Sequence, residues 1–344
     1  MTKNRNRSST CLRALAILVI SAGARCALAL DPNLPPGQNF DLSHWYLTLP
    51  VDSSGGTNGT AATISAAQLA AGYTNPPYFY TGTDGAMVFY CPATGATTSG
   101  SSNPRSELRE QLNTNDNSVD WTANGVNVLT AQCKANSIAS GGQMGIAQVH
   151  GYNPNMPLVI LRYDNSLNQE IVDATVKYNT SNAPVNGNTD ATLTFTNVGL
   201  NQLINYQIVV SNGVAIITVN GQVQSQNFYA TDPNWTNANF YFKAGDYYTD
   251  NGGTTNASQV SYYALAARHL PNFDGVVQSG SNLTFDGSSG LANSNYFVLS
   301  ATNLALPLTN WTTVATNTFD SSGNFVFTNP IGPASQNFFI LKLP

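Results

Sequence analysis

Three short stretches of this chain place ionisable, amide and phenol side chains at alternating positions. They are Arg105-Ser-Glu-Leu-Arg109, Gln148-Val-His150 and Tyr241-Phe-Lys-Ala-Gly-Asp-Tyr247. Successive side chains of a β-strand point to opposite faces, so each stretch would direct its polar residues to one face and its apolar residues into a core. Laid side by side, the three predicted strands would form one concave polar wall.

The residue types on this wall suit the β-elimination of an acidic sugar polymer. The C5 proton of a uronate becomes removable only when donors aimed at its carboxylate stabilise the developing anion. Arg105 and Gln148 fit that task. A base must then take the C5 proton, and an acid must protonate the departing glycosidic oxygen. His150 and Tyr247 fit those two roles.

The three stretches resemble the signature strands of the polysaccharide lyase family 7 alginate lyases in residue type, order and wide spacing. The segments Phe40–Pro50 and Tyr262–Leu265 are similar to that family as well, so the resemblance covers roughly residues 30 to 271. It implies an all-β, concanavalin-like β-jelly-roll sandwich whose concave sheet binds the anionic polysaccharide alginate. The catalytic residues that it implies are Arg105, Gln148, His150 and Tyr247.

The resemblance also implies a set of residues that line the substrate subsites. These are Arg109, Lys243 and Tyr241, together with Glu107, which stands between two arginines and is expected to orient them. Family members commonly carry glutamine two residues beyond the catalytic tyrosine, whereas this chain has Thr249 there. One outer subsite contact of the family is therefore left open.

The centre of the Gln-x-His motif bears on which uronate is cut. Within the family, valine at this position is associated with mannuronate-rich substrate and isoleucine with guluronate, so Val149 favours mannuronate blocks. A lyase that acts on glucuronan or another polyuronate stays open as an alternative, because the same elimination chemistry serves those polymers.

Two other classes of protein fit the pattern less well. A glycoside hydrolase needs two carboxylic acids facing one bond, but Glu107 is the only acid of the predicted wall and Glu110 has the opposite parity. A non-catalytic, lectin-like module needs no paired proton donor and acceptor such as Tyr247 and His150. Any one of the three motifs alone is more typical of a structural role than of a catalytic site. Arg-x-Glu-x-Arg, for example, is typical of a cross-strand ion-pair ladder. The three motifs together favour the catalytic interpretation.

Residues 1 to 29 predict a secretory signal peptide. Basic residues between Lys3 and Arg13 precede the apolar run Leu15–Ile20, and the segment closes on Ala27-Leu-Ala29. We therefore expect the mature protein to be secreted, either outside the cell or into the periplasm. The apolar run is too short to span a membrane, and no later segment is long and apolar enough, so we expect no association with membranes.

Removal of this segment changes the charge of the chain. It takes away five of the thirteen basic residues and none of the eighteen acidic ones, which leaves a net charge near minus ten. This balance argues against nucleic acid as a partner. Three of the remaining cations, Arg105, Arg109 and Lys243, lie in the motif strands, which indicates that positive charge is concentrated where an anion is held. We expect a monomer.

The rest of the chain is a series of short strands separated by turn residues. Few charges, with abundant Asn, Thr, Ser, Gly and Tyr, predict an all-β protein. The only helix that we expect is Ser65–Gly72. The other strands predicted in the lyase domain, residues 30 to 271, are Ala86–Cys91, Val126–Lys134, Gly145–His150, Leu158–Tyr163, Glu170–Tyr178, Ala191–Thr196, Tyr206–Val210, Val214–Val219, Asn239–Tyr247 and Val260–Arg268.

Residues 272 to 344 predict a linker and a small C-terminal β-rich module. The linker-like part is Asn272–Asn282. Four strand candidates follow it, at Tyr296–Ser300, Trp311–Ala315, Asn324–Thr328 and Phe338–Leu343. At roughly sixty residues the module is of marginal size for independent stability, and it contains no group of residues that we assign to catalysis.

The cysteines and histidines offer no site for a metal. Cys91 and Cys133 alone remain after removal of the signal peptide, and a disulfide or a pair of buried free thiols are both compatible with their places at strand ends. The three histidines are scattered and have no metal-ligand spacing. We expect no metal in the site and no cofactor, because arginine supplies the neutralising charge, while a structural calcium among the Asp and Asn loops stays open.

Overall fold

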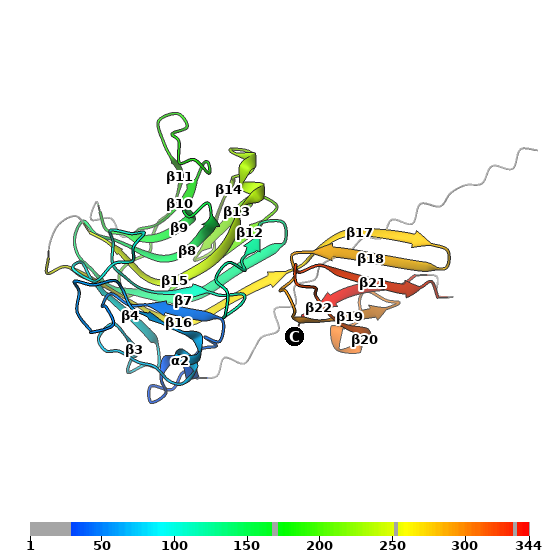
Figure 1. Ribbon diagram of the computed structural model, residues 1–344, viewed down its shortest axis with the longest axis horizontal. Helices are drawn as coiled ribbons and strands as arrows, with labels where there is room; N and C mark the ends of the chain where they lie inside the picture. The colour runs from blue at the N-terminus through cyan, green and yellow to red at the C-terminus, as the bar shows by residue number, and fades with distance from the viewer. Residues whose placement is uncertain (1–28, 167–170, 251–253, 333–335, 344) are drawn as a thin grey trace, which may run out of the picture. The chain divides into compact units, whose positions relative to one another are not determined.

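The computed structural model describes residues 29 to 166, 171 to 250, 254 to 332 and 336 to 343. The predicted signal peptide, residues 1 to 29, lies outside this part of the chain except for Ala29. No helix within the described residues is long and apolar enough to cross a lipid bilayer. The described chain divides into two compact units, of which the first ends at Leu270 and the second begins at Pro271 (Figure 1).

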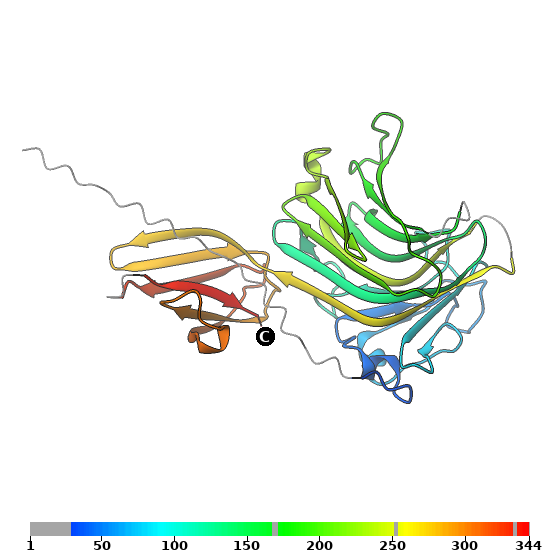
Figure 2. The ribbon, with the colours of Figure 1, turned by 180° about the vertical axis from the view of Figure 1, so that it is seen from behind.

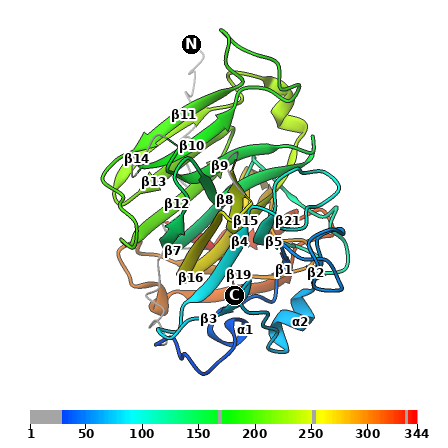
Figure 3. The same cartoon turned by 90° about the vertical axis from the view of Figure 1, so that its left-hand side faces the viewer.

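The first unit consists of two antiparallel sheets packed face to face, which confirms the predicted all-β sandwich (Figures 1 and 2). The large sheet runs, in spatial order, through β11 (Asp190–Phe195), β10 (Ile171–Lys177), β9 (Pro157–Asp164), β8 (Gln143–Asn153), β15 (Asn239–Thr249), β5 (Arg105–Glu110), β1 (Trp45–Thr48) and β2 (Thr63–Ile64), with β6 (Trp121–Thr122) paired to β15. Figure 3 shows this succession from β11 to β2.

The second sheet lies behind the large one and carries none of the three motifs. Its spatial order is β14 (Gln222–Asn227), β13 (Val214–Val219), β12 (Ile204–Ser211), β7 (Val126–Ile138), β16 (Ala257–Leu270), β4 (Met87–Pro92) and β3 (Phe79–Thr81). Its long strands β7 and β16 pair with each other over most of their length. The sheet therefore acts as a broad support for the strands that carry the motifs.

The core fills the space between the two sheets and is built from alternate residues of their strands. In β12, every second residue from Ile204 to Val210 is buried. In the motif strands, Leu108 and Val149 are fully buried in the same core. Because neighbouring side chains of a strand point to opposite faces, the polar residues of β5 and β8 lie on the face of the large sheet that is turned away from the core. We call this the open face.

The predicted helix is present as α2 (Ala66–Ala70). The Ser65 hydroxyl accepts a hydrogen bond from the backbone N–H of Gln68, and the Gln68 side chain accepts one from the backbone N–H of Ser65. This capping box satisfies two N–H groups that the first turn leaves free. The other helical turns are α1 (Pro36–Asn39) and the 3-10 helices η1 (Pro233–Asn237) and η2 (Leu308–Asn310).

Several observed strands are missing from the predicted set, namely β14, β17 (Asn272–Ser279), β18 (Asn282–Ser288) and the short strands β2, β3 and β6. The expected linker Asn272–Asn282 is wrong, since Asn272–Ser279 forms strand β17 and pairs with β18. Its valines Val276 and Val277 are both exposed, so the strand lacks the buried alternation by which strands are recognised. Strand β14 is absent from the predicted set because glutamines occupy its more buried positions.

The second unit has a core of its own. It contains two three-stranded sheets, β17-β18-β21 (Phe325–Pro330) and β20 (Thr312–Thr318)-β19 (Asn295–Ala301)-β22 (Phe338–Lys342). All four strand candidates of this module overlap an observed strand. Its main core is largely aromatic and is formed by Phe285, Tyr296, Val298, Phe319, Phe325, Phe327 and Leu341.

The two cysteines of the first unit are free and buried. Cys91 lies in β4 and Cys133 in β7, and β16 runs between these two strands. Two strand spacings amount to roughly 9.6 Å, which is beyond the Cα separation that a disulfide can bridge. Burial raises the pKa of both thiols, so they stay protonated and pack as small core residues.

Because each unit buries its own apolar residues, we expect a chain of residues 30 to 270 to fold without the second unit. Its thermal unfolding, followed by circular dichroism, should be cooperative and should reproduce one of the transitions of the longer chain of residues 30 to 344. Aggregation of the shorter chain, or a gradual loss of signal on heating, would contradict a boundary at Leu270.

Candidate active site

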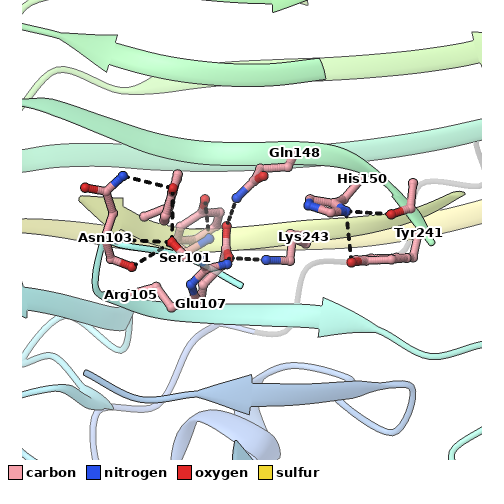
Figure 4. A network of polar contacts seen from close by, with 12 residues as sticks. Ser101, Asn103, Arg105, Glu107, Gln148, His150, Tyr241 and Lys243 are labelled. Atoms are coloured by element: carbon pink, nitrogen blue, oxygen red, sulfur yellow. Dashed lines mark hydrogen bonds and ion pairs between the residues drawn. The ribbon is translucent and has the colours of Figure 1, made fainter. Parts of the chain in front are cut away.

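The three motif strands are neighbours in the large sheet, with β15 in the middle. Lys243 of β15 lies opposite Arg109 of β5 on one side and opposite Gln148 of β8 on the other. All eight predicted site residues therefore share the open face, and we call them together the polar wall: Arg105, Glu107, Arg109, Gln148, His150, Tyr241, Lys243 and Tyr247. Figure 4 shows Arg105, Glu107, Gln148, His150, Tyr241 and Lys243.

Glu107 is the centre of the polar wall. Its carboxylate is 2.6 Å from Lys243 Nζ and 3.3 Å from Arg105 Nη1, and it accepts a hydrogen bond from Gln148 Nε2 at 2.5 Å. Only 1% of the residue is exposed. Burial on its own would raise the pKa of Glu107, but Lys243 and Arg105 outweigh burial and hold that pKa below its usual value. Glu107 is therefore an anion that orients three neighbours. Of the two arginines that the sequence predicts it to orient, it holds only Arg105, because Arg109 pairs with Asp120 instead.

Lys243 is held beside this carboxylate in a buried position. Burial lowers the pKa of Lys243 to about 8, while Glu107 opposes the shift. The ammonium group therefore keeps its charge at neutral pH and lies under the centre of the wall. Gln148 is fixed through the nitrogen of its amide, so the amide oxygen and the second N–H of Nε2 remain for a ligand.

His150 and Tyr241 form one end of the polar wall. The Nδ1 atom of His150 lies 2.8 Å from the carbonyl oxygen of Gly151 and 3.0 Å from the Tyr241 hydroxyl. A carbonyl oxygen can only accept, so Nδ1 carries the proton and Nε2 keeps its lone pair. Burial, followed by the charge of Lys243, lowers the pKa of His150 to about 3. His150 is thus a neutral imidazole with a free base at Nε2.

Arg109 reinforces this end of the wall. Its guanidinium carbon lies 3.7 Å from the centre of the Tyr241 ring, which is a cation–π contact. The same guanidinium donates to the carbonyl oxygen of Asn117 at 2.9 Å and lies 3.4 Å from a carboxylate oxygen of Asp120. Burial raises the pKa of Asp120 to about 7, although Arg109 opposes the shift.

Tyr247 forms the opposite end of the wall. Its hydroxyl accepts a hydrogen bond from Asn103 Nδ2 at 3.1 Å and lies 3.4 Å from Ser101 Oγ. The guanidinium carbon of Arg105 is 4.5 Å from the centre of the Tyr247 ring. Ser101 and Asn103 belong to the loop before β5, and no spacing in the sequence marks them as partners of a residue so far along the chain.

The strand register separates the backbones of His150 and Tyr247 along the polar wall. His150 lies opposite Tyr241, whereas Tyr247 lies opposite Gly145. The five steps along β8 from Gly145 to His150 correspond to roughly 17 Å of strand. The Glu107 network lies between the two ends (Figure 4). The two groups predicted to transfer protons therefore stand at opposite ends of the wall.

A β-bulge sets the position of Tyr247. Between Ala244 and Tyr247, strand β15 contains one residue more than the facing segment of β8. Gly245 has a φ of +143°, and a Cβ atom there would lie 2.6 Å from the carbonyl oxygen of Ser106. Only glycine fits this conformation and this space. The sharp turn of the bulge thus explains the glycine of the motif.

Tyr262 of the second sheet satisfies the backbone of this bulge. The N–H of Gly245 donates to the Tyr262 hydroxyl at 3.1 Å, and that hydroxyl donates to the carbonyl oxygen of Ile146 in β8. The sequence prediction places Tyr262 in a family-like segment but assigns it no part in the site. Only the packing of the two sheets shows that it supports β8 and β15 at once.

Glu110 lies on the core side of the sheet, as its parity predicts. Its carboxylate accepts hydrogen bonds from Trp121 Nε1 and from the backbone N–H of Phe242, both at 3.0 Å, and it lies 2.8 Å from His269 Nε2. These partners occupy both oxygens in the interior. Glu110 therefore cannot act with Glu107 as the pair of acids that a glycoside hydrolase requires.

Comparison with known proteins agrees with this geometry. A family model described as alginate lyase matches residues 40 to 269. A curated alginate lyase of Klebsiella pneumoniae is 46% identical over 85 residues, which are 24% of this chain and 27% of that protein. The match thus spans about a quarter of that relative's length.

Two similar solved structures extend over a whole domain. A family 7 alginate lyase, A1-II', in complex with product is 38% identical and has a TM-score of 0.62 over 68% of this chain and 99% of that chain. An alginate lyase from Pseudomonas aeruginosa is 32% identical and has a TM-score of 0.57 over 67% of this chain and 99% of that chain. Both are therefore similar to this chain over about two thirds of its length.

We expect His150 to stay neutral far into the acid range. A free histidine takes up a proton near pH 6.5, whereas burial lowers the pKa of His150 to about 3. As pH falls below 6.5 the unfolded chain binds this proton and the folded chain does not, so His150 lowers folding stability with increasing acidity. Imidazole NMR shifts, assigned with His150→Asn, should show no transition for His150 above pH 5. A transition near pH 6.5 would contradict the buried neutral form.

Proposed function

Because this chain belongs to the polysaccharide lyase family 7 alginate lyases, we propose that it cleaves alginate by β-elimination, prefers mannuronate blocks and releases unsaturated uronate ends. The observation that carries the proposal is the network in which Glu107 holds Arg105, Gln148 and Lys243 on one face of the sheet. The name of one similar structure records product bound to that protein, and the name of another records bound substrate.

In the proposed mechanism, Arg105 and Gln148 receive the carboxylate of the uronate that is to be deprotonated. One nitrogen of each is already bonded to Glu107, so both are oriented before substrate arrives. Donors that need no reorganisation when charge develops stabilise a transition state most effectively. Lys243 adds a positive charge beneath them, which favours the enolate-like dianion further.

The proton transfers follow from the stereochemistry of the sugar. In mannuronate the C5 proton and the leaving oxygen lie on the same side of the ring, so one residue can remove the first and protonate the second. Tyr247 suits both steps, because Asn103 donates to its oxygen and Arg105 lies against its ring, so that the phenol is held in place.

Guluronate requires a different arrangement, since its C5 proton and leaving oxygen lie on opposite sides of the ring. His150 would then act as base through Nε2 and Tyr247 as acid. Val149 is fully buried in the core, so it can influence the choice between the two sugars only through the placement of Gln148 and His150. A preference for mannuronate is consistent with the single-residue route and with Val149.

We also propose that the enzyme is exported by the signal peptide of residues 1 to 29 and acts as a monomer. The family match ends at residue 269, so the second unit lies outside it. Attachment, secretion or substrate tethering are the roles that we propose for this unit. An exported protein whose N-terminal sequence does not begin near Leu30 would contradict the proposed cleavage site.

Arg105→Ala and Gln148→Ala should each lower kcat by about a hundredfold or more, which is the usual scale for the loss of one preorganised donor. The rate is measured on polymannuronate through the ultraviolet absorbance of the unsaturated product. Arg268→Ala, which removes an exposed arginine of β16, is the matched control and should be fully active. Near-normal activity of a folded Arg105→Ala or Gln148→Ala protein would remove that residue from the site.

Tyr247→Phe should abolish cleavage of mannuronate blocks, because the single-residue route needs the phenol as both base and acid. His150→Asn keeps a hydrogen-bonding group and should leave part of this activity. Initial rates on polymannuronate, polyguluronate and glucuronan, compared for the wild type and both variants, test the proposal. Faster cleavage of polyguluronate by the wild type would overturn the preference, and substantial activity of Tyr247→Phe would overturn the mechanism.

A further inference from the structure

A second group of polar side chains lies on the open face beyond the polar wall. The register places Tyr247 of β15 opposite Gly145 of β8, Gly145 opposite Arg162 of β9, and Arg162 opposite Asp173 of β10. The residues next to them in their own strands, Leu161 before Arg162 and Val172 before Asp173, are buried in the core. Arg162 and Asp173 therefore continue, across the strands, a row that begins at Tyr247.

Arg162 differs from the other cations of the open face. Each cation of the polar wall has a carboxylate within 3.4 Å, and Lys177 of β10 lies 2.8 Å from Asp190. Among the residues that the structure describes, no carboxylate lies within ion-pair distance of Arg162. Its Nη1 donates to Thr175 Oγ1 at 2.8 Å, while its buried Nε has no hydrogen-bond partner in the described chain. The guanidinium thus lacks an anion.

Two carboxyl groups lie nearby but bind each other instead. Asp164 accepts hydrogen bonds from Gln143 Nε2 and from the backbone N–H of Ser166, both at 2.7 Å. Asp173 is 7% exposed and has a buried Oδ1 atom to which no described group donates. Burial, and then the hydrogen bond with Asp164, raise the pKa of Asp173 to about 7. The charge of Arg162 opposes the shift. Below pH 7 Asp173 is therefore largely protonated and joined to Asp164, so it does not neutralise Arg162.

We propose that Arg162 is an outer subsite of the open face, which binds the carboxylate of a uronate residue in a chain that crosses the strands from Tyr247 towards β10. The inference rests on the proposed function, because the row leads away from the residue assigned to proton transfer. A guanidinium that no carboxylate neutralises matches the carboxylate of a uronate in charge and in hydrogen-bonding type.

Gly145 leaves room for this path. It separates Tyr247 from Arg162 by two strand spacings, or roughly 10 Å. A Cβ atom at Gly145 would lie 3.3 Å from the Cβ of Tyr247 and 3.4 Å from Cγ2 of Ile160, so any side chain would fill the floor between Tyr247 and Arg162. Glycine keeps this part of the open face low enough for a sugar ring to pass.

The acid pair makes the subsite dependent on pH. The charged groups that face Asp173 are Arg162 and Asp164 of β9, while Thr194 of β11 opposite it and Gln143 of β8 are neutral. The remaining charged residues of this side, Lys177 and Asp190, are paired with each other. Loss of the proton from Asp173 therefore changes the formal charge of the group around Arg162 from zero to minus one. Binding of an anionic sugar should weaken as pH rises through 7.

The test measures binding separately from turnover. In a Tyr247→Phe background, which is expected to be inactive, calorimetry gives Kd for saturated mannuronate oligomers of increasing length at pH 6. Arg162→Ala should weaken binding of the longer oligomers about tenfold or more, the scale of one charge-assisted contact, and should leave the disaccharide unchanged. Arg162→Lys should recover part of the loss. Lys177→Ala, which removes a cation that is already paired, is the matched control and should have no effect.

Variation of pH completes the experiment. Between pH 6 and pH 8 the ratio of the disaccharide Kd to the Kd of the longer oligomers should fall for the Tyr247→Phe protein and stay constant when Asp173→Asn is added. The ratio is used because Asp120 and Lys243 of the polar wall also titrate in this range and affect oligomers of every length. An equal effect of Arg162→Ala and Lys177→Ala, or an Arg162→Ala loss that is the same for all lengths, would overturn the subsite. If Arg162→Ala fails to fold, the same comparison is made with Arg162→Lys. If the wild type fails to cleave alginate, the proposed function is overturned. That result differs from the binding results that would overturn the subsite, so the two proposals can be rejected separately.

Discussion

The polar wall depends on one buried carboxylate. Glu107 binds Arg105 of its own strand, Lys243 of β15 and Gln148 of β8, so a single anion links the three strands that carry the motifs. If Glu107 were absent, two buried cations would lose their partner, and an uncompensated buried charge costs about 3 to 5 kcal/mol. The same contact that stabilises the wall also aims the donors that the proposed chemistry requires, so orientation and stability cannot be altered separately.

This arrangement requires that the three strands keep their register, and the second sheet helps to hold it. A slip of one residue would turn the polar residues into the core, which Leu108, Ala244 and Ala147 oppose through their complete burial. At the bulge, Tyr262 bonds to the backbone of β8 and β15 together. Core packing therefore fixes the register of the regular part of the motif strands. The Tyr262 hydroxyl fixes the bulge that precedes Tyr247.

The sequence predicts the faces of the strands better than it predicts their neighbours. Leu108 and Val149 identify the core side of their motifs through alternation alone, and the Glu107 network follows from that alternation. The bulge at Gly245 and its contact with Tyr262 depend on how β15 packs against β16 of the second sheet. No local sequence pattern predicts that packing. Arg162 and Asp173 carry no signal either, since each is one polar residue between buried ones and they meet only through the pairing of β9 with β10. Strand β17 is missed for the opposite reason, because its apolar residues are exposed.

The charges of the open face also explain how an acidic protein can hold a polyanion. The whole chain has a formal net charge of minus five, but charges further away than about 8 to 10 Å are largely screened at physiological ionic strength. The local balance is therefore what a uronate meets. On the polar wall Glu107 and Asp120 offset part of the charge of three cations, and they keep those side chains rigid for charge that develops only during reaction. Among the described residues Arg162 has no carboxylate within ion-pair distance. In the proposed scheme the polar wall therefore stabilises the charge that develops in the transition state, whereas Arg162 binds the substrate before reaction.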